Sequence, residues 1–294
     1  MTGLTKPTSK GVVHDDVLLH TVLEGMESDI NDLNPTNRTY DYLSTIVNTD
    51  KSPKDNIRSL QAKLPTQPTR FATWNLWGGY STEQFFDNDR QSPRKTKLLQ
   101  EQFLDAQVDY FGFQECFVNP AIRVNYLSVP PLNNAFFGMS DDAGKGEHFG
   151  NMTLTRFTPI NSYSKVYDDQ TPTSLDIFRR SYIRERLPNG ITAYTTHLST
   201  DPARVTNMLA ELLIEVNANG GSKIVLMGDF NTSNPADLAA FESAGFTIVN
   251  KANWGSSIDR LLVKGLTITG FNKVQILGKG SQLSDHDMYY VDVQ

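Results

Sequence analysis

The chain has 294 residues, with 27 lysines and arginines against 33 aspartates and glutamates, so its formal net charge is −6. A single cysteine, Cys116, excludes an internal disulfide framework, and no cysteines and histidines stand at zinc-finger spacing. No apolar run reaches the ~20 residues of a membrane span, and the first residues lack the profile of a signal peptide. We therefore expect a soluble, cytoplasmic protein, and its acidic balance argues against nonspecific binding of duplex DNA through a broad basic face.

The first 68 residues differ in composition from the rest of the chain. They are rich in Thr, Asn, Asp and Ser, and between residues 19 and 33 apolar residues recur at the three- and four-residue steps of a helix. Pro65 and Pro68 mark a linker. We predict an extension over 1–68, mostly helical or partly disordered, that is either a tether or a module for a protein partner. A single large domain follows over 69–294.

Short β-rich runs and a few helices alternate through 69–294. The apolar pattern predicts, in chain order, strand 71–76, helix 93–106, strand 108–115, helix 120–127, strand 152–155, strands 180–187 and 191–197, helix 204–216, strand 224–230, a helix after Pro235, and strands 257–263, 266–274 and 288–293. Asn189-Gly190 favours a tight hairpin turn with positive φ angles. Many strands with interspersed helices predict two packed sheets with helices outside. Residues 78–92 and 140–150 are expected to be loops that determine specificity.

Polar residues cluster where the predicted strands end, which is where a buried sheet presents side chains to a cleft. The residues at these ends are Asn75, Glu115, His197, Asp229, Asn231, Asp259, Asp285 and His286. The carboxylates among them are hard oxygen ligands or proton acceptors, and they suit Mg²⁺ or Mn²⁺ rather than zinc. Such an ion stabilises charge on a phosphoryl group while a carboxylate orients the attacking water. The set therefore favours phosphate chemistry.

Two of these groups have informative spacing. Asp229 and Asn231 are two residues apart at a strand end, so their side chains point the same way, and a carboxylate for water meets an amide for a phosphate oxygen. Asp285 and His286 are adjacent, so one can approach a metal while the other approaches the phosphate. A second carboxylate is then needed to hold the imidazole, and Asp259 is the candidate.

The order of these short motifs resembles that of the endonuclease/exonuclease/phosphatase superfamily, which has the deoxyribonuclease I-like fold. The matching motifs are Thr73-Trp74-Asn75, Gln114-Glu115, Thr196-His197-Leu198, Gly228-Asp229-Phe230-Asn231, Asp259-Arg260 and Ser284-Asp285-His286, together with the strand from Gly150 to Phe157. Each motif alone occurs by chance, whereas the ordered set extends from about Arg70 to Val293. The resemblance says nothing about residues 1–68.

The resemblance implies an α/β (α+β) fold, a four-layer sandwich of two mixed β-sheets flanked by helices. It implies hydrolysis of phosphoester bonds with Mg²⁺ or Mn²⁺ as the cofactor. Glu115 would be the main metal ligand, with Asn75 and Asp285 close to the metal. Whether one or two metal ions bind stays open.

The resemblance also implies the catalytic roles. Asp229 would orient or deprotonate the water, and Asn231 and His197 would bind the scissile phosphate. His286, held by Asp259, would stabilise the charge of the transition state, an effect worth about 3–4 kcal/mol for each preorganised donor.

Three functions stay open at this point. The leading one is a metal-dependent phosphodiesterase that acts as a nuclease on DNA or RNA, and the alternatives are a phosphatase or phosphodiesterase of small molecules or lipids, of inositol phosphate or sphingomyelin type, and a non-catalytic binding scaffold. Trp74, Trp77 and Tyr80 could stack on a base or line a small pocket. Four arginines near the predicted hairpin could contact a substrate backbone: Arg179, Arg180, Arg184 and Arg186.

Overall fold

The computed structural model describes residues 68–76, 93–118, 127–144, 147–169, 176–249, 251, 257–274 and 283–294. The predicted extension, apart from Pro68, and the predicted helix at 120–127, apart from Leu127, lie outside these residues. The predicted loop at 78–92 lies outside them as well. Within the described ranges, no helix combines the length and the apolar character that crossing a bilayer requires.

Two six-stranded sheets form the described domain. The strands of sheet 1, in spatial order, are β11 (Ile268–Val274), β12 (Met288–Val293), β1 (Thr69–Asn75), β2 (Tyr110–Val118), β4 (Glu147–Thr155) and β3 (Asn134–Gly144). β1 and β2 are parallel, and the other neighbours are antiparallel. β12 therefore lies inside the sheet, between β11 and the first described strand of the chain.

Sheet 2 has the same mixed character. Its strands, in spatial order, are β5 (Asn161–Val166), β6 (Ser181–Arg186), β7 (Thr192–His197), β8 (Ile224–Asp229), β10 (Asp259–Lys264) and β9 (Thr247–Ile248). β7 and β8 are parallel, and the other neighbours are antiparallel. The prediction of two mixed sheets is confirmed.

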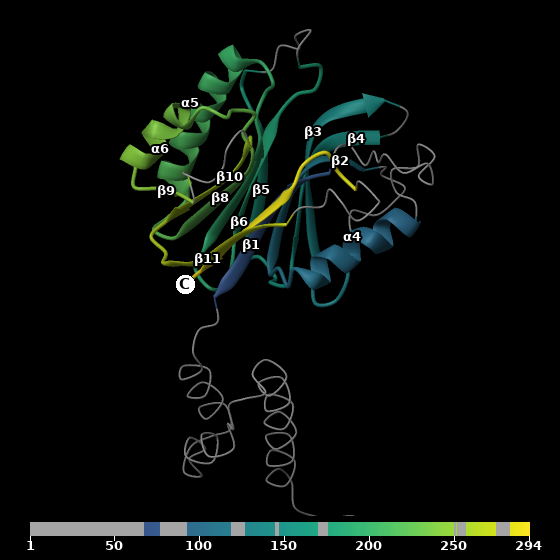
Figure 1. Ribbon diagram of the computed structural model, residues 1–294. Helices are drawn as coiled ribbons and strands as arrows, with labels where there is room; N and C mark the ends of the chain where they lie inside the picture. The colour runs from purple at the N-terminus through teal and green to yellow at the C-terminus, as the bar shows by residue number, and fades with distance from the viewer. Residues whose placement is uncertain are drawn as a thin grey trace, which may run out of the picture. The chain divides into compact units, whose positions relative to one another are not determined.

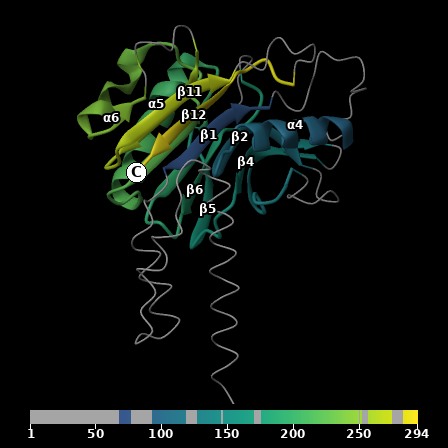
Figure 2. The same ribbon diagram turned by 60° about the horizontal axis from the view of Figure 1, so that its bottom comes forward.

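Helices cover the outer faces of both sheets (Figure 1). α4 (Pro93–Asp105) lies across the strands of sheet 1 (Figure 2), where its Leu99 and Phe103 pack into the same apolar cluster as Phe111. α5 (Pro202–Asn219) and α6 (Ala239–Ser243) lie on the side of sheet 2. α5 begins at the N-cap Asp201, which accepts a hydrogen bond from the backbone N–H of Ala203. The four layers predicted from the sequence are thus present.

The inner faces of the two sheets pack closely and share polar contacts. Tyr110 of sheet 1 donates a hydrogen bond from its hydroxyl to Glu185 of sheet 2 at 2.9 Å. Gly112 of β2 faces Thr195 of β7, and a Cβ atom at Gly112 would lie 2.3 Å from Oγ1 of Thr195. Close packing is therefore the reason for a glycine here. Its φ angle is not positive, so the backbone conformation does not require one.

Three strands were not predicted, namely β3, β5 and β9. The sequence of β3, Asn134–Gly144, contains Asn, Asp and Gly and has no regular alternation of apolar residues, so it reads as turn-like. The prediction of a loop at 140–150 is wrong, because its described residues belong to β3 and β4. The predicted hairpin is present as β6 and β7, and of Asn189 and Gly190 only the glycine has a positive φ angle, of 83°.

Candidate active site

The register of sheet 2 places three of the predicted residues side by side. His197 pairs with Asp229 in the parallel β7–β8 ladder, and Asp229 pairs with Asp259 in the antiparallel β8–β10 ladder. His197 and Asp229 are the last residues of their strands, and Asp259 is the first of its own. Backbone hydrogen bonding alone therefore brings an imidazole and two carboxylates to one edge of the sheet.

The backbone at the end of β8 and directly after it has a conformation that suits glycine and asparagine. Gly228 has a φ angle of 149°, and a Cβ atom there would lie 1.9 Å from the carbonyl oxygen of Thr196. Asn231 has a φ angle of 50°, and its backbone N–H donates to Oδ1 of Asp229 at 2.9 Å. Nδ2 of Asn231 donates to the carbonyl oxygen of Leu198 at 2.9 Å. Asn231, which the sequence predicts to bind the phosphate, thus also fixes the turn that orients Asp229.

Asn75 connects the two sheets at the site. Its side chain is fully buried, and Nδ2 donates to Oδ2 of Asp229 at 3.0 Å and to Oε1 of Glu115 at 3.1 Å. Ser284 donates a hydrogen bond to the carbonyl oxygen of Asn75 and accepts one from the backbone N–H of His286. The segment that carries His286 is therefore attached to the end of β1.

A β-bulge turns Glu115 toward this group. Side chains alternate along a strand, so Gln114 and Glu115 should face opposite sides of the sheet. The ladder between β2 and β4 shifts register between Phe113 and Cys116, and Glu115 has a φ angle of 53°. Phe113 and Cys116 consequently enter the same outer apolar cluster although they are three residues apart. The extra residue gives Glu115 its contact with Asn75.

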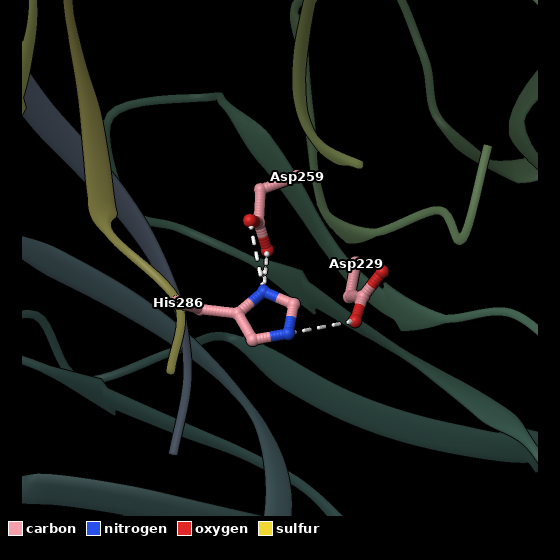
Figure 3. Close-up of side chains that lie close together, drawn as sticks. All are labelled: Asp229, Asp259 and His286. Carbon is pink, nitrogen blue, oxygen red and sulfur yellow. Dashed lines mark hydrogen bonds and ion pairs between the residues drawn. The ribbon is translucent and has the colours of Figure 1, made fainter. Parts of the chain in front are cut away.

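His286 lies between two carboxylates (Figure 3). Its Nδ1 is 3.0 Å from Oδ2 and 3.2 Å from Oδ1 of Asp259, and its Nε2 is 3.8 Å from Oδ2 of Asp229. Burial lowers the pKa of His286, but the hydrogen bond to Asp259 and the nearby negative charges outweigh it and raise the pKa to about 9. His286 is therefore a cation at neutral pH.

His197 has the opposite environment. Its Nε2 is 3.6 Å from Oδ2 of Asp229, and Nη1 of Arg180 lies 2.9 Å from its Nδ1 and 3.0 Å from its Nε2. Burial, followed by the positive charges of Arg180 and His286, lowers the pKa of His197 well below 6.5. His197 is therefore neutral at the pH where His286 is charged.

Asp229 is the common contact of the group and can take up a proton near neutral pH. It is 1% exposed, and this burial, together with the charge of Asp259, raises its pKa to about 7. His286 and the hydrogen bonds from Asn75 and Asn231 act in the opposite direction. A carboxylate with a pKa in this range is suited to accept a proton from water.

Asp285 stands apart from the other predicted residues. It is exposed, and within the part of the chain that the structure describes, no hydrogen bond joins it to the others. Its negative charge contributes to the raised pKa of His286. Trp74, a candidate for stacking on a base, is fully buried and packs edge-on against Phe103 of α4, so it cannot contact substrate. Trp77 and Tyr80 lie outside the described residues.

The chemistry of the donor atoms fits a divalent cation. Ligand atoms of Asp229, Asp259 and His286 lie within 4.8 Å of one another. A protonated imidazole that donates to Asp259 does not bind metal, so His286 is the least suited of the three. Glu115 and Asp229 both accept from the amide of Asn75, and these neighbouring oxygen atoms are hard ligands of the kind that Mg²⁺ prefers.

The sequence does not single out the charged residues beside His197, which are Arg180 and Asp176. In the sequence Arg180 is one of four arginines near the hairpin, and no motif marks Asp176, which binds it. Ser181 pairs with His197 in the β6–β7 ladder, so the register of the hairpin places Arg180 beside this histidine. That register was the available indication. Arg184 instead pairs with Glu215 of α5.

A family model described as the endonuclease/exonuclease/phosphatase family matches residues 72–286. Among solved structures, the chain is similar to the endonuclease/exonuclease/phosphatase from Bacteroides vulgatus, with a TM-score of 0.58 and 17% identity over 78% of this chain and 99% of that one. It is similar to a humanised TDP2 of D. rerio, with a TM-score of 0.57 and 18% identity over 77% and 98% of the two chains. It is also similar to the mannosyl-6-phosphatase Bt3783 of Bacteroides thetaiotaomicron, with a TM-score of 0.54 and 15% identity over 77% and 99%. No curated protein matches the sequence.

Proposed function

Because this chain belongs to the endonuclease/exonuclease/phosphatase family, we propose that it is a Mg²⁺- or Mn²⁺-dependent phosphodiesterase that acts as a nuclease. Members of the family are hydrolytic, act as nucleases, phosphatases and phosphodiesterases, and generally depend on a divalent metal ion. One observation carries the proposal: Asp229, Asn75, Glu115, His197 and His286 meet through hydrogen bonds and ion pairs at one edge of the sandwich.

Asp229 is the residue that we assign to the nucleophilic water. Its Oδ1 is held by the backbone N–H of Asn231 and its Oδ2 by Nδ2 of Asn75, so the carboxylate has a fixed orientation. In this role it orients the water and takes up its proton as the water attacks phosphorus. Such general base catalysis contributes about 10²- to 10⁴-fold.

Glu115 is the main ligand that we assign to the metal, with Asn75 and Asp285 nearby. When bound, the ion neutralises charge on a phosphoryl oxygen and stabilises the leaving oxygen. Asn75 holds Glu115 and Asp229 with one amide group, so the metal ligand and the base keep a constant relation to each other. This relation is what a positioned attack in line with the leaving group requires.

The two histidines have different roles in this proposal. His286, held by Asp259, is a cation and stabilises the negative charge that grows on the phosphoryl oxygens. His197 is neutral and donates a ring N–H to a phosphate oxygen without titrating near neutral pH. Asn231 is the remaining group that we assign to the phosphate.

The substrate class is the part of the proposal with a competing alternative. Nucleic acid is the substrate that we propose, and a small phosphoester or lipid headgroup is the alternative. The likeness to the mannosyl-6-phosphatase gives that alternative a specific basis, although at 15% identity it concerns the fold alone. A protein partner for residues 1–68 stays a prediction.

Hydrolysis by the full chain tests the proposal. The substrates are supercoiled plasmid, single-stranded DNA, RNA, bis-p-nitrophenyl phosphate and p-nitrophenyl phosphate, each with Mg²⁺, Mn²⁺ or EDTA. Asp229→Asn is the inactive variant, and Asp292→Asn is its matched control. Asp292 pairs with Arg70 near the C-terminal end of β12, which is the end away from the site.

Metal-dependent cleavage of a nucleic acid by wild type and Asp292→Asn, with a 10²- to 10⁴-fold loss in Asp229→Asn, is the expected result. Cleavage of the small esters alone would replace the nuclease by a small-molecule phosphoesterase. Activity that persists in EDTA or in Asp229→Asn would contradict the mechanism, and no activity on any substrate would favour the scaffold.

A further inference from the structure

A buried group of charged residues adjoins His197 and has no place in the mechanism above. Arg180 precedes β6, Arg204 lies in the first turn of α5, and Asp176 precedes Arg180 by four residues. These three residues are 6%, 5% and 2% exposed. Charged side chains are rarely buried to this extent unless they are paired, so the arrangement requires an explanation.

Asp176 fixes the guanidinium of Arg180. Its Oδ1 accepts from Nε at 3.0 Å and from Nη2 at 2.7 Å, and its Oδ2 accepts from Nε at 3.1 Å. These bonds engage one edge of the planar guanidinium, which leaves Nη1 directed at the ring of His197. An arginine N–H can only donate, so the ring nitrogen that accepts from it carries no proton.

Arg204 connects Asp176 to a rigid element. Its Nη1 lies 3.7 Å from Oδ2 of Asp176, and its Nη2 donates to the carbonyl oxygen of Asp169 at 2.7 Å. Because Arg204 belongs to α5, which is capped by Asp201, the carboxylate that holds Arg180 is itself held from a helix. Removing one member would leave the others buried with their charge less well compensated.

Phe149 limits the movement of the Arg180 guanidinium and the His197 ring from another side. The guanidinium carbon of Arg180 lies 5.6 Å from the centroid of the Phe149 ring, and the centroid of the His197 ring lies 6.4 Å from it. The His197 ring therefore has an arginine, an aromatic ring and Asp229 around it. Its orientation is fixed before any substrate binds.

We propose that Arg180 is a positioning residue for His197, and that Asp176 and Arg204 hold it in this role. This inference rests on the proposed function, which assigns His197 to the phosphate. The carboxylate of Asp259 orients His286. His197 is instead oriented by the guanidinium of Arg180, which is itself held by the carboxylate of Asp176. Nη1 of Arg180 lies within 3.0 Å of both ring nitrogens, so the neutral ring accepts from it at one nitrogen and carries its proton on the other.

The experiment compares Arg180→Gln and Asp176→Asn with Arg184→Gln. Arg184 is the matched control. It lies on β6, the strand that follows Arg180, and it pairs with Glu215 of α5 away from the site. The first measurement is the ¹⁵N chemical shift of the His197 ring in histidine-labelled, metal-free protein, which needs no catalysis. The second is kcat and KM for bis-p-nitrophenyl phosphate with Mg²⁺, in the wild-type and His197→Gln backgrounds.

We expect Arg180→Gln and Asp176→Asn to shift the ¹⁵N resonances of His197 and to lower kcat about 10- to 100-fold. Arg184→Gln should change neither quantity. In the His197→Gln background, Arg180→Gln should cause little further loss, because a residue that acts through His197 has nothing left to position. Where Arg180→Gln does not fold, Arg180→Lys takes its place, since it keeps the charge and removes the fork.

Unchanged His197 resonances in both variants would overturn the inference, whatever the activity. Fully additive losses in the His197→Gln background would also overturn it, because they would show that Arg180 acts on its own. If the wild-type protein hydrolyses no ester, the proposed function fails, while the ¹⁵N shifts still decide whether Arg180 orients the ring.

Discussion

His197 and His286 approach the same atom from different elements: their Nε2 atoms lie 3.6 Å and 3.8 Å from Oδ2 of Asp229. One ring is paired with an arginine and the other with an aspartate. Of two histidines that share a carboxylate, one is thus charged and the other neutral at neutral pH. A phosphate beside Asp229 would meet one cationic donor and one neutral donor.

The first prediction concerns the titration of these two rings. Followed by NMR in metal-free protein, His286 should keep its proton up to about pH 9, because Asp259, Asp229 and Asp285 favour its charged form. His197 should stay neutral well below pH 6.5, because burial and Arg180 disfavour its charged form. Two rings that titrate together near pH 6.5 would contradict the geometry of the site.

The second prediction concerns Asp259→Asn. Without this carboxylate, burial dominates at His286, and its pKa should fall from about 9 toward or below 6.5. The alkaline limb of the pH–rate profile should move to lower pH, so the loss of kcat should be greater at pH 8 than at pH 6. A loss of the same size at every pH would show that Asp259 does not act through the charge of His286.

The third prediction concerns the cost of Asp229 to stability. Its folded-state pKa is about 7 against an ordinary value of 3.8, so the unfolded chain ionises first as pH rises. The titration of Asp229 should therefore lower the stability of the folded state between about pH 4 and pH 7, by up to about 4 kcal/mol, and its contribution should stay constant above that range. Asp229→Asn removes this titration. The free energy of unfolding of Asp229→Asn, measured relative to that of wild type, should therefore increase over the same pH window.

Urea denaturation in EDTA at several pH values measures this advantage. Asp292→Asn serves as the control, because Asp292 pairs with Arg70 at a partly exposed position away from Asp229. A difference between Asp229→Asn and wild type that does not change with pH would contradict the raised pKa.

The fourth prediction concerns metal binding. Glu115→Gln keeps the shape of the side chain and removes its charge, so the Mg²⁺ concentration that gives half the maximal rate should rise at least ~10-fold. Asp285→Asn should cause a smaller rise, because Asp285 is exposed and stands apart from the hydrogen-bonded group. Calorimetry with Mn²⁺ gives the same comparison without catalysis, and equal affinities for wild type and Glu115→Gln would remove Glu115 from the metal site.

The fifth prediction concerns the packing between the sheets. Gly112→Ala should destabilise the domain by about 1–3 kcal/mol, because a Cβ atom there would lie 2.3 Å from Oγ1 and 2.9 Å from Cγ2 of Thr195. Adding Thr195→Ala removes both atoms and should restore part of the loss. Additive effects of the two substitutions on thermal unfolding would mean that the pair does not determine the spacing of the sheets.

Much of this architecture could be predicted from the sequence because its central strands are apolar and its helices are amphipathic. β8 is an uninterrupted buried run, and α5 shows its apolar face at helical spacing. β3 and β5 could not be predicted, since their residues are half-exposed at the margins of the sheets and lack regular alternation.

The candidate site divides in the same way. Asp229 and Asn231 could be placed on one side from their spacing alone. The contact between Asn75 and Asp229 spans 154 residues and two sheets, so only the packing of the sheets produces it. The orientation of Glu115 depends on a β-bulge that the residue types of β2 do not predict. Asp176 reaches the site only through its hydrogen bonds to Arg180, which the sequence pattern does not predict either.

β12 lies between β11 and β1, so the first and last described strands are hydrogen-bonded neighbours, joined also by an Arg70–Asp292 ion pair across 222 residues. On the ribosome, β1 emerges long before the strand that covers its edge, and closing so long a loop is slow. His286 lies two residues before β12 and reaches Asp259 only when that strand docks. An unfinished chain therefore lacks the second histidine of the site, and the group around Asp229 is complete only when the sheet is complete.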